Sequence, residues 1–294
     1  MHWQNVTLVG VGLLGGSLGL ALKQRRLADR VDGYVRRKES VTECEKFRVA
    51  DHTTLDLAAA VAKADLVILC TPIAQMRPLV EQMLPALKSG AIVTDVGSVK
   101  ASVVAELETL VAGAGAHFVG SHPMAGMERT GVSAAKADLF TNAVCVITPT
   151  AASHPPAVSA LEQFWQSVGA RTLRLTPEAH DDLVGRCSHL PHVVAAELTN
   201  YILSPVHPRE QATLCATGFR DTTRIASGSP EMWRDIALAN RKNLARVLGV
   251  FVEDLQEFQR ALESGDAKVI EEFFQTAKQR RDQWQGGNAS SSPE

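Results

Sequence analysis

Short apolar runs alternate with longer amphipathic segments over residues 6–176. Runs rich in Val, Ile and Leu are typical of strands buried on both faces of a parallel sheet, and segments with apolar residues at helical spacing are typical of the helices that cover such a sheet. The pattern predicts an α/β fold, a doubly wound parallel sheet with helices that include residues 74–87 and 101–111. The predicted strands are residues 6–9, 31–35, 66–70, 92–96, 118–120, 144–148 and 172–175.

The pattern changes after Pro177, where strand-like runs stop and helical spacing continues to Trp284. Breaks that contain Pro and Ser interrupt it at residues 204–208 and 227–230. We expect a sheet domain over residues 1–176 and an all-helical domain over residues 177–285. Residues 286–294 are mostly Gly, Ser, Asn and Pro, and a disordered tail is expected there.

One helical segment predicts self-association. Residues 241–262 carry an apolar stripe that is too wide for one small helical domain to bury against its own residues. A homodimer formed through the helical domain is therefore expected. The stripe consists of Leu244, Val247, Leu248, Phe251, Leu255, Phe258 and Leu262.

A glycine-rich segment links the first predicted strand to a helix. It reads G-x-G-x-x-G, and a strand before it and a helix after it make this common motif specific for dinucleotide binding in a Rossmann domain. The first glycine permits the tight turn, the second lets a pyrophosphate approach the backbone, and the third lets the helix pack against the strand. The predicted contact residues are Gly10, Gly12, Leu13, Leu14 and Gly15.

The residues after the second strand bear on the choice of cofactor. An acidic side chain there would hold the ribose 2′-hydroxyl of NAD, but this chain has Val35 followed by Arg36 and Arg37, with Ser40 nearby. Guanidinium groups and a hydroxyl suit a 2′-phosphate. We predict a preference for NADP. The alternative is that the two arginines are solvated and that the protein accepts both NADP and NAD.

Composition narrows the possible partners. The formal net charge of −2 gives no reason to expect nucleic acid or an anionic membrane as a partner. No apolar run reaches the roughly 18 to 20 residues of a membrane span, and residues 1–6 are not expected to form a signal peptide. The five cysteines are odd in number and never spaced C-x-x-C, which predicts reduced thiols in a cytoplasmic protein.

Several polar segments follow strand ends and are expected to share one pocket, because ligands of an open α/β sheet sit beyond the carboxyl ends of its strands. Thr71 and Pro72 follow one strand, Ser98 follows another, and His122 follows a third. An imidazole can accept a proton near neutral pH, so His122 is the candidate base. A lone histidine is as often structural, but Ser98 at a neighbouring strand end favours a functional role.

The helical domain offers further candidates. His189 and His192 lie three residues apart, but no Cys cluster or H-E-x-x-H completes a zinc site, and no metal is predicted. At least one of these histidines is expected to line a cleft between the domains. Residues 218–226, which include Arg224, form a second polar segment of this domain.

Five segments in this order resemble the prephenate and arogenate dehydrogenases of tyrosine biosynthesis. They are residues 10–17, 95–100, 121–126, 188–192 and 220–233, and the resemblance spans about residues 6–283. It implies a Rossmann domain, an all-helical dimerisation domain and an active site between them. In the family, the histidine that matches His122 binds the ring 4-hydroxyl of the substrate and helps remove its proton.

The resemblance also implies the other roles. The serine that matches Ser98 supports that contact beside the nicotinamide, and the arginine that matches Arg224 binds a substrate carboxylate. The resemblance places His192 and His189 at positions that face the substrate, and Trp233 matches a tryptophan near the cleft. The regulatory and mutase segments fused to some relatives are expected to be absent, so any control by tyrosine would act at the active site.

Alternatives remain open at this point. A 3-hydroxyacid or imine-reductase type dehydrogenase shares the domain plan but usually uses a lysine of the helical domain, and residues 177–240 contain none. A nicotinamide-binding sensor without catalysis would need only the cofactor pocket, whereas this chain retains Ser98, His122 and Arg224. The residues do not decide between prephenate and arogenate.

Overall fold

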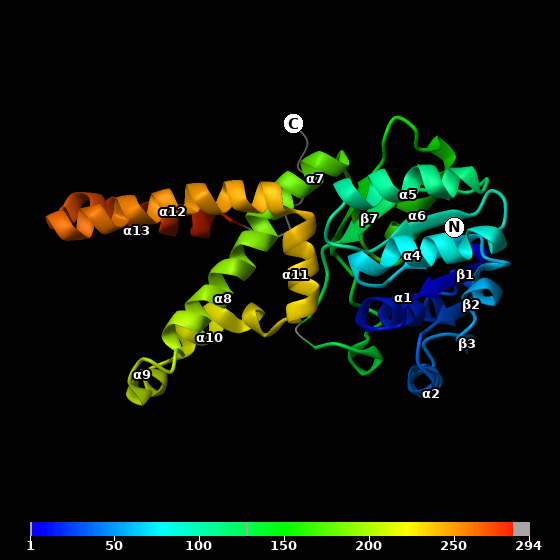
Figure 1. Cartoon of the computed structure of the whole chain (residues 1–294), viewed down its shortest axis with the longest axis horizontal. Helices are drawn as coiled ribbons and strands as arrows, with labels where there is room; N and C mark the ends of the chain where they lie inside the picture. The colour runs from blue at the N-terminus through cyan, green and yellow to red at the C-terminus, as the bar shows by residue number, and fades with distance from the viewer. Residues whose placement is uncertain (1, 128, 285–294) are drawn as a thin grey trace. The chain divides into compact units, whose positions relative to one another are not determined.

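The computed structural model describes residues 2–127 and 129–284 (Figure 1). Contacts between Cα atoms divide the chain into two compact units, residues Met1–Asn240 and the segment from Arg241 onward. No helix of the described residues is long and apolar enough to cross a membrane. The predicted tail at residues 286–294 lies outside the described residues.

A six-stranded parallel sheet forms the centre of the first unit, and the predicted Rossmann-type α/β class is confirmed. Its spatial order is β3-β2-β1-β4-β5-β6, so the order in which strands are added to the sheet reverses between β1 and β4. This reversal leaves a crevice at the carboxyl ends of the two central strands, where such sheets bind ligands. The strands are β1 (Trp3–Val9), β2 (Ala28–Tyr34), β3 (His52–Thr54), β4 (Leu66–Leu69), β5 (Ile92–Asp95) and β6 (His117–Phe118).

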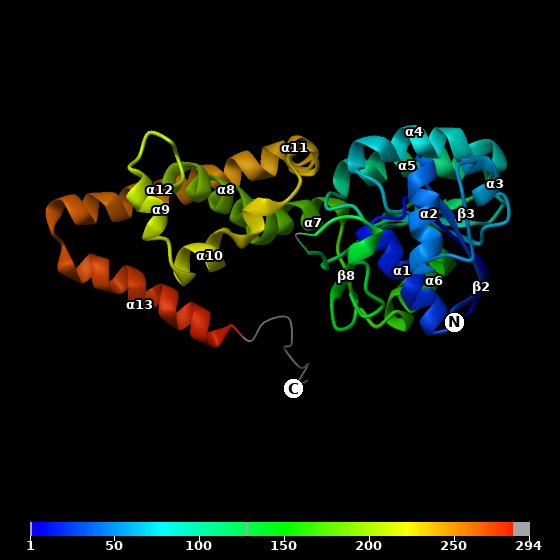
Figure 2. The same ribbon diagram turned by 90° about the horizontal axis from the view of Figure 1, so that it is seen from below.

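Helices cover both faces of this sheet. Figure 2 shows α4 (Ile73–Met83) and α5 (Ala101–Gly113) on one side and α1 (Leu13–Gln24) and α6 (Pro155–Ser167) on the other. Two separate apolar cores result, one containing Leu18, Leu22, Phe164 and Trp165, the other Met76, Val80, Val103 and Leu107. Burial on both faces explains why the central strands are rich in apolar residues. The remaining helices of this region are α2 (Lys38–Phe47), α3 (Leu57–Val61) and the short 3₁₀ turns η1 (Leu84–Ala86) and η2 (Val132–Ala134).

A second, three-stranded sheet departs from the sequence prediction. It consists of β7 (Gly120–Pro123), β8 (Val144–Thr148) and β9 (Arg171–Arg174), with β7 antiparallel to β8 and β8 parallel to β9. The expectation that these strands continue the parallel sheet is wrong, because the chain leaves that sheet after β6. His122 therefore lies within a strand, opposite Val146, and not in a loop after a strand end.

The strands are followed by short helices that pack in the same compact unit. Thr176 caps α7 by accepting the N–H of Ala179, and Ser229 caps α11 by accepting the N–H of Met232. A π-helical turn, η3 (Gly185–His189), joins α7 directly to α8. The helices are α7 (Pro177–Val184), α8 (Leu190–Ile202), α9 (Arg209–Thr213), α10 (Thr217–Thr223), the 3₁₀ turn η4 (Arg224–Ser227) and α11 (Pro230–Ala239).

The second unit contains two helices, α12 (Arg241–Ser264) and α13 (Ala267–Gln283). Gly265 adopts a positive φ of 68° between them, and Asp266 caps α13 by accepting the N–H of Val269. Phe258 stacks on Phe273 with a centroid distance of 4.4 Å. The long helix predicted from residues 241–262 is confirmed as α12.

Candidate active site

The glycine loop has the geometry that a dinucleotide site needs. Gly10 has a φ of +94°, and a Cβ there would lie 2.9 Å from the carbonyl oxygen of Cys70. A Cβ on Gly15 would overlap the carbonyl oxygen of Gly10, so this glycine lets α1 approach the loop. A Cβ on Gly12, by contrast, would have no heavy atom within 4 Å. The space beside Gly12 is thus open to a ligand that approaches the backbone.

The start of α1 leaves donors for an anion. Helix α1 begins at Leu13, followed by Leu14, and no side chain caps its first turn. Uncapped N–H groups and the helix dipole favour a phosphate at this position. Thr71 lies against Gly10, and its Oγ1 is buried without a hydrogen-bond partner among the described residues. Pro72 follows as the N-cap of α4. These features fit a bound nicotinamide dinucleotide.

The predicted adenosine-binding residues lie at the same sheet edge. The N–H of Gly10 donates to the carbonyl of Tyr34, the last residue of β2, at 2.9 Å. Arg36 and Arg37 follow after Val35, and both side chains are exposed. Ser40 lies in the first turn of α2 and is half-buried. The structure therefore places the end of β2, which leads into this group, next to the glycine loop.

A network of buried, hydrogen-bonded side chains extends from His122. Its Nδ1 lies 2.8 Å from Nε2 of His180, and Nδ1 of His180 lies 2.8 Å from Oδ1 of Asp181. The Asp181 carboxylate also accepts the backbone N–H groups of Lys100 and Ala101, at 2.7 and 2.9 Å, at the start of α5. Burial above all, followed by the charges of His180 and Lys100, holds the pKa of His122 well below its usual value. His122 is therefore neutral at neutral pH, as a base must be.

A buried ion pair holds the segment that carries Ser98. Lys100 Nζ pairs with the Asp95 carboxylate and donates to the carbonyl of Ser121 at 2.9 Å. The Asp95 carboxylate also accepts the N–H of Gly97 at 2.8 Å. These contacts tie the loop after β5 to strand β7, on which His122 lies. Ser98 itself is half-buried, and among the described residues no hydrogen bond joins it to His122.

His189 lies in a second branch of the same network. The amide nitrogen of Asn240 donates to the backbone carbonyl of Asp181 at 2.8 Å and lies 3.1 Å from His189 Nδ1. The Nε2 atom of His189 is buried and has no hydrogen-bond partner among the described residues. Burial lowers the pKa of His189 to about 4, although Asp181 and the nearby backbone of Ser98 oppose this shift.

His192 and Trp233 stack on one another, with ring centroids 3.7 Å apart and planes inclined by 30°. His192 Nδ1 lies 2.9 Å from the carbonyl oxygen of Ser188 and donates to it. Burial lowers the pKa of His192. The His189 ring meets Trp233 edge-on, at 6.1 Å. The structure thus groups His189, His192 and Trp233.

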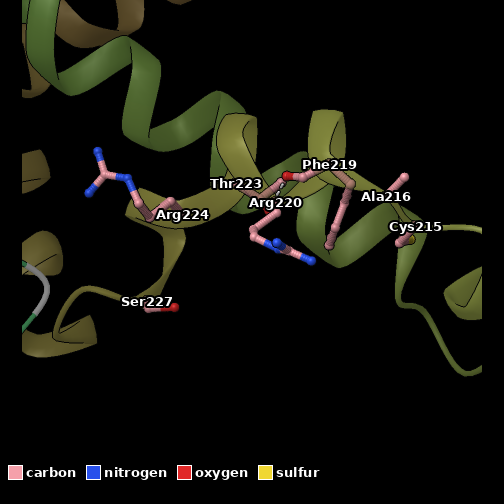
Figure 3. Close-up of a pocket in the computed structure, with 7 residues that line it drawn as sticks. All are labelled: Cys215, Ala216, Phe219, Arg220, Thr223, Arg224 and Ser227. Atoms are coloured by element: carbon pink, nitrogen blue, oxygen red, sulfur yellow. Dashed lines mark hydrogen bonds between the residues drawn. The ribbon is translucent and has the colours of Figure 1, made fainter.

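Arg224 lies elsewhere on these helices. It begins η4, is exposed, and lines a hollow of about 540 Å³ together with Arg220 and Phe219. Figure 3 shows the guanidinium groups of Arg220 and Arg224 pointing apart. Between them, the hydroxyl of Thr223 donates a hydrogen bond to the carbonyl oxygen of Phe219. The other residues around the hollow are Cys215, Ala216, Thr223 and Ser227.

Sequence reasoning missed His180, Asp181 and Asn240. The three are buried polar residues whose partners lie far away in the chain. The available signal was weak: an adjacent His–Asp pair just after Pro177 and an Asn between two helical patterns. Buried polar side chains of this kind are hydrogen-bonded, and which partners they take depends on the tertiary fold.

Two family descriptions match the chain. "Prephenate dehydrogenase, nucleotide-binding domain" matches residues 18–174, and "Prephenate dehydrogenase, dimerization domain" matches residues 176–279. The prephenate dehydrogenase of Bacillus subtilis is 35% identical over 283 residues, which are 94% of this chain and 75% of that protein.

Solved structures agree with this similarity. Prephenate dehydrogenase of Aquifex aeolicus, in complex with hydroxyphenyl propionate and NAD⁺, superposes with a TM-score of 0.89 at 31% identity, covering 96% of this chain and 98% of that one. Arogenate dehydrogenase of Synechocystis superposes with a TM-score of 0.79 at 30% identity, covering 95% and 99%.

Proposed function

The chain belongs to the prephenate dehydrogenase family, and from this premise we propose that it oxidatively decarboxylates prephenate or arogenate with a nicotinamide cofactor. The observation that carries the proposal is His122, a buried imidazole kept neutral and held by a second histidine, in the same compact unit as the glycine loop. Both named substrates are cyclohexadienes with a ring hydroxyl and a quaternary carboxylate.

The proposed reaction needs one base and no metal. When bound, the nicotinamide supplies a hydride acceptor. His122 takes the proton of the ring hydroxyl through its free Nε2, which drives the hydride from the hydroxyl-bearing carbon. The ring carboxylate then leaves as carbon dioxide, and its bonding electrons make the ring aromatic. His122 returns the proton to the phenolate oxygen, so the imidazole ends the cycle neutral.

The remaining residues would orient the substrate. We assign Ser98 to the hydroxyl end beside the nicotinamide, and Arg224 to a substrate carboxylate, because a guanidinium binds carboxylates through paired hydrogen bonds. His192 and Trp233 would form a stacked wall, with His189 beside them. Holding the substrate in this way lowers the entropic barrier of hydride transfer.

For the cofactor we propose NADP in preference to NAD. Support comes from Val35, which directly follows β2 at the position of the usual acidic residue, and from the two exposed arginines after it. Arg36→Ala is expected to raise the KM for NADP by about tenfold or more while changing the KM for NAD little, because charge-assisted phosphate contacts are strong. An unchanged KM for NADP would contradict the assignment, and Arg48→Ala, on the C-cap of α2, is a matched control.

We also propose a homodimer and two functional domains, residues 1–176 for the cofactor and residues 177–285 for substrate and dimerisation. The match to the dimerisation-domain description over residues 176–279 supports both. Further support comes from α12 and α13, on which several large apolar side chains are exposed. They include Val250, Leu255, Leu262, Phe273 and Phe274.

The decisive experiment is steady-state kinetics with prephenate and arogenate, each combined with NADP and with NAD. Formation of the reduced nicotinamide is followed by its absorbance, and carbon dioxide release is measured in parallel. We expect equal amounts of both products with at least one substrate. Absence of reduced cofactor in all four combinations would refute the proposed function.

A further inference from the structure

The buried network around Asp181 determines where the protons sit on two histidines. The Asp181 carboxylate accepts two backbone N–H groups, from Lys100 and Ala101, and it faces Nδ1 of His180. An ionised carboxylate can only accept hydrogen bonds. Nδ1 of His180 must therefore carry a proton and donate it to Asp181.

The state of His180 then fixes His122. When His180 is neutral, it has one donor and one acceptor nitrogen, so its Nε2 is an acceptor once its Nδ1 is protonated. Nδ1 of His122 lies 2.8 Å from this acceptor and must be the donor of that hydrogen bond. The Nε2 atom of His122 is consequently left without a proton. This is the form of the imidazole that can take a proton from a ligand.

The backbone of Asp181 fixes His189 in the opposite form. Asn240 must direct its NH₂ group at the carbonyl oxygen of Asp181, because that oxygen can only accept. The same NH₂ group lies 3.1 Å from Nδ1 of His189, which must therefore be an acceptor. The proton of neutral His189 is thus on Nε2, the buried atom that has no partner among the described residues.

We infer that Asp181 sets His122 and His189 in opposite tautomers. Through His180 it leaves Nε2 of His122 as a hydrogen-bond acceptor, and through Asn240 it leaves Nε2 of His189 as a donor. His180 and Asn240 are positioning residues that act through the histidines they contact. The role of His122 rests on the proposed function, whereas the proton positions can be measured without a substrate.

The first test is the imidazole ¹⁵N NMR spectrum of the full chain, labelled at histidine, near neutral pH. Signals are assigned by their loss in His122→Asn and His189→Gln. We expect a protonated Nδ1 and a bare Nε2 for His122, and the reverse for His189. A proton on Nε2 of His122, or on Nδ1 of His189, would overturn the inference even if the wild-type protein turns over its substrate.

The second test separates the tautomer from simple packing. His180→Phe keeps a planar ring but offers no acceptor, so His122 would distribute between both tautomers; kcat should fall about 10- to 100-fold, the usual scale for losing a partner that orients a functional histidine. His180→Gln again places an NH₂ toward Asp181 and an oxygen toward His122. It should recover kcat to within about threefold of wild type, although an amide cannot take up a proton.

Cofactor affinity and the melting temperature are measured for both variants, because loss of fold would lower them together with kcat. An unchanged kcat in His180→Phe would overturn the role of His180. A kcat in His180→Gln as low as that in His180→Phe would also overturn this role, because it would mean that His180 must itself take up a proton. If the wild-type chain turns over neither substrate, the proposed function fails, and the ¹⁵N spectrum still decides the tautomers.

Discussion

Two glycines of the cofactor loop should respond to alanine in opposite ways. At Gly15 the added Cβ would overlap the carbonyl oxygen of Gly10, so α1 and the loop must move apart. Overpacking of this kind costs about 1–3 kcal/mol, and each kcal/mol lowers the melting temperature by roughly 2–4 °C in a protein of similar size. At Gly12 the Cβ would meet no heavy atom within 4 Å, so the free energy of unfolding should change by about 1 kcal/mol or less.

The substitution at Gly12, which should change stability little, is the one expected to weaken cofactor binding. The Cβ at Gly12 would occupy the space that the pyrophosphate needs, so we expect the dissociation constant of the preferred cofactor to rise at least about tenfold, or about 1.4 kcal/mol. Calorimetry gives the melting temperature and titration gives the affinity for each variant. Gly113→Ala, which also has open space at its Cβ but lies at the end of α5, is the matched control. Wild-type affinity in Gly12→Ala, or a wild-type melting temperature in Gly15→Ala, would refute the reasoning.

Two further predictions concern the histidines. His122→Asn keeps a donor for His180 but cannot take a proton, so kcat should fall by about 10² to 10⁴ with cofactor affinity unchanged; a loss below about tenfold would exclude His122 as the base. The lowered pKa of His189, about 4 instead of 6.5, means that protonation favours the unfolded chain. The free energy of unfolding should thus fall as the pH drops from 6.5 toward 4, by about 3 kcal/mol from this residue alone. Urea unfolding at several pH values measures this loss, and His189→Gln should reduce it; an equal loss in that variant would contradict the assignment.

The sequence predicted the parts of the fold that depend on local pattern. Strands β1, β4 and β5 were identified because most of their residues are buried, which leaves short runs rich in apolar residues. Strand β3 was missed because its three residues, His-Thr-Thr, form a polar edge strand. The departure of β7 from the main sheet was also missed, since apolar periodicity specifies a strand but not the sheet to which it belongs.

The candidate site likewise has a part that the sequence could predict and a part that it could not. The glycine loop could be recognised because its turn, its close approach and its helix start all lie within a few neighbouring residues. The partners of His122 could not, because His180 and Asp181 reach it only when α7 packs against β7 and α5. Hydrogen bonds between residues so far apart leave no periodic trace in the chain. Recognition of His122 depended on its sequence context and on family resemblance.

The π-helical turn Gly185–His189 determines the direction in which the whole of α8 faces. Such a turn corresponds to one extra residue inserted in an otherwise continuous helix, and π turns of this kind frequently occur at functional sites. Removal of a single residue here would restore ordinary α-helical winding and rotate α8 by about 100° around its axis relative to α7. His192 would then leave the indole of Trp233 while every side chain remained chemically intact. The length of this turn therefore sets the orientation of the histidine cluster as firmly as the identities of its residues do.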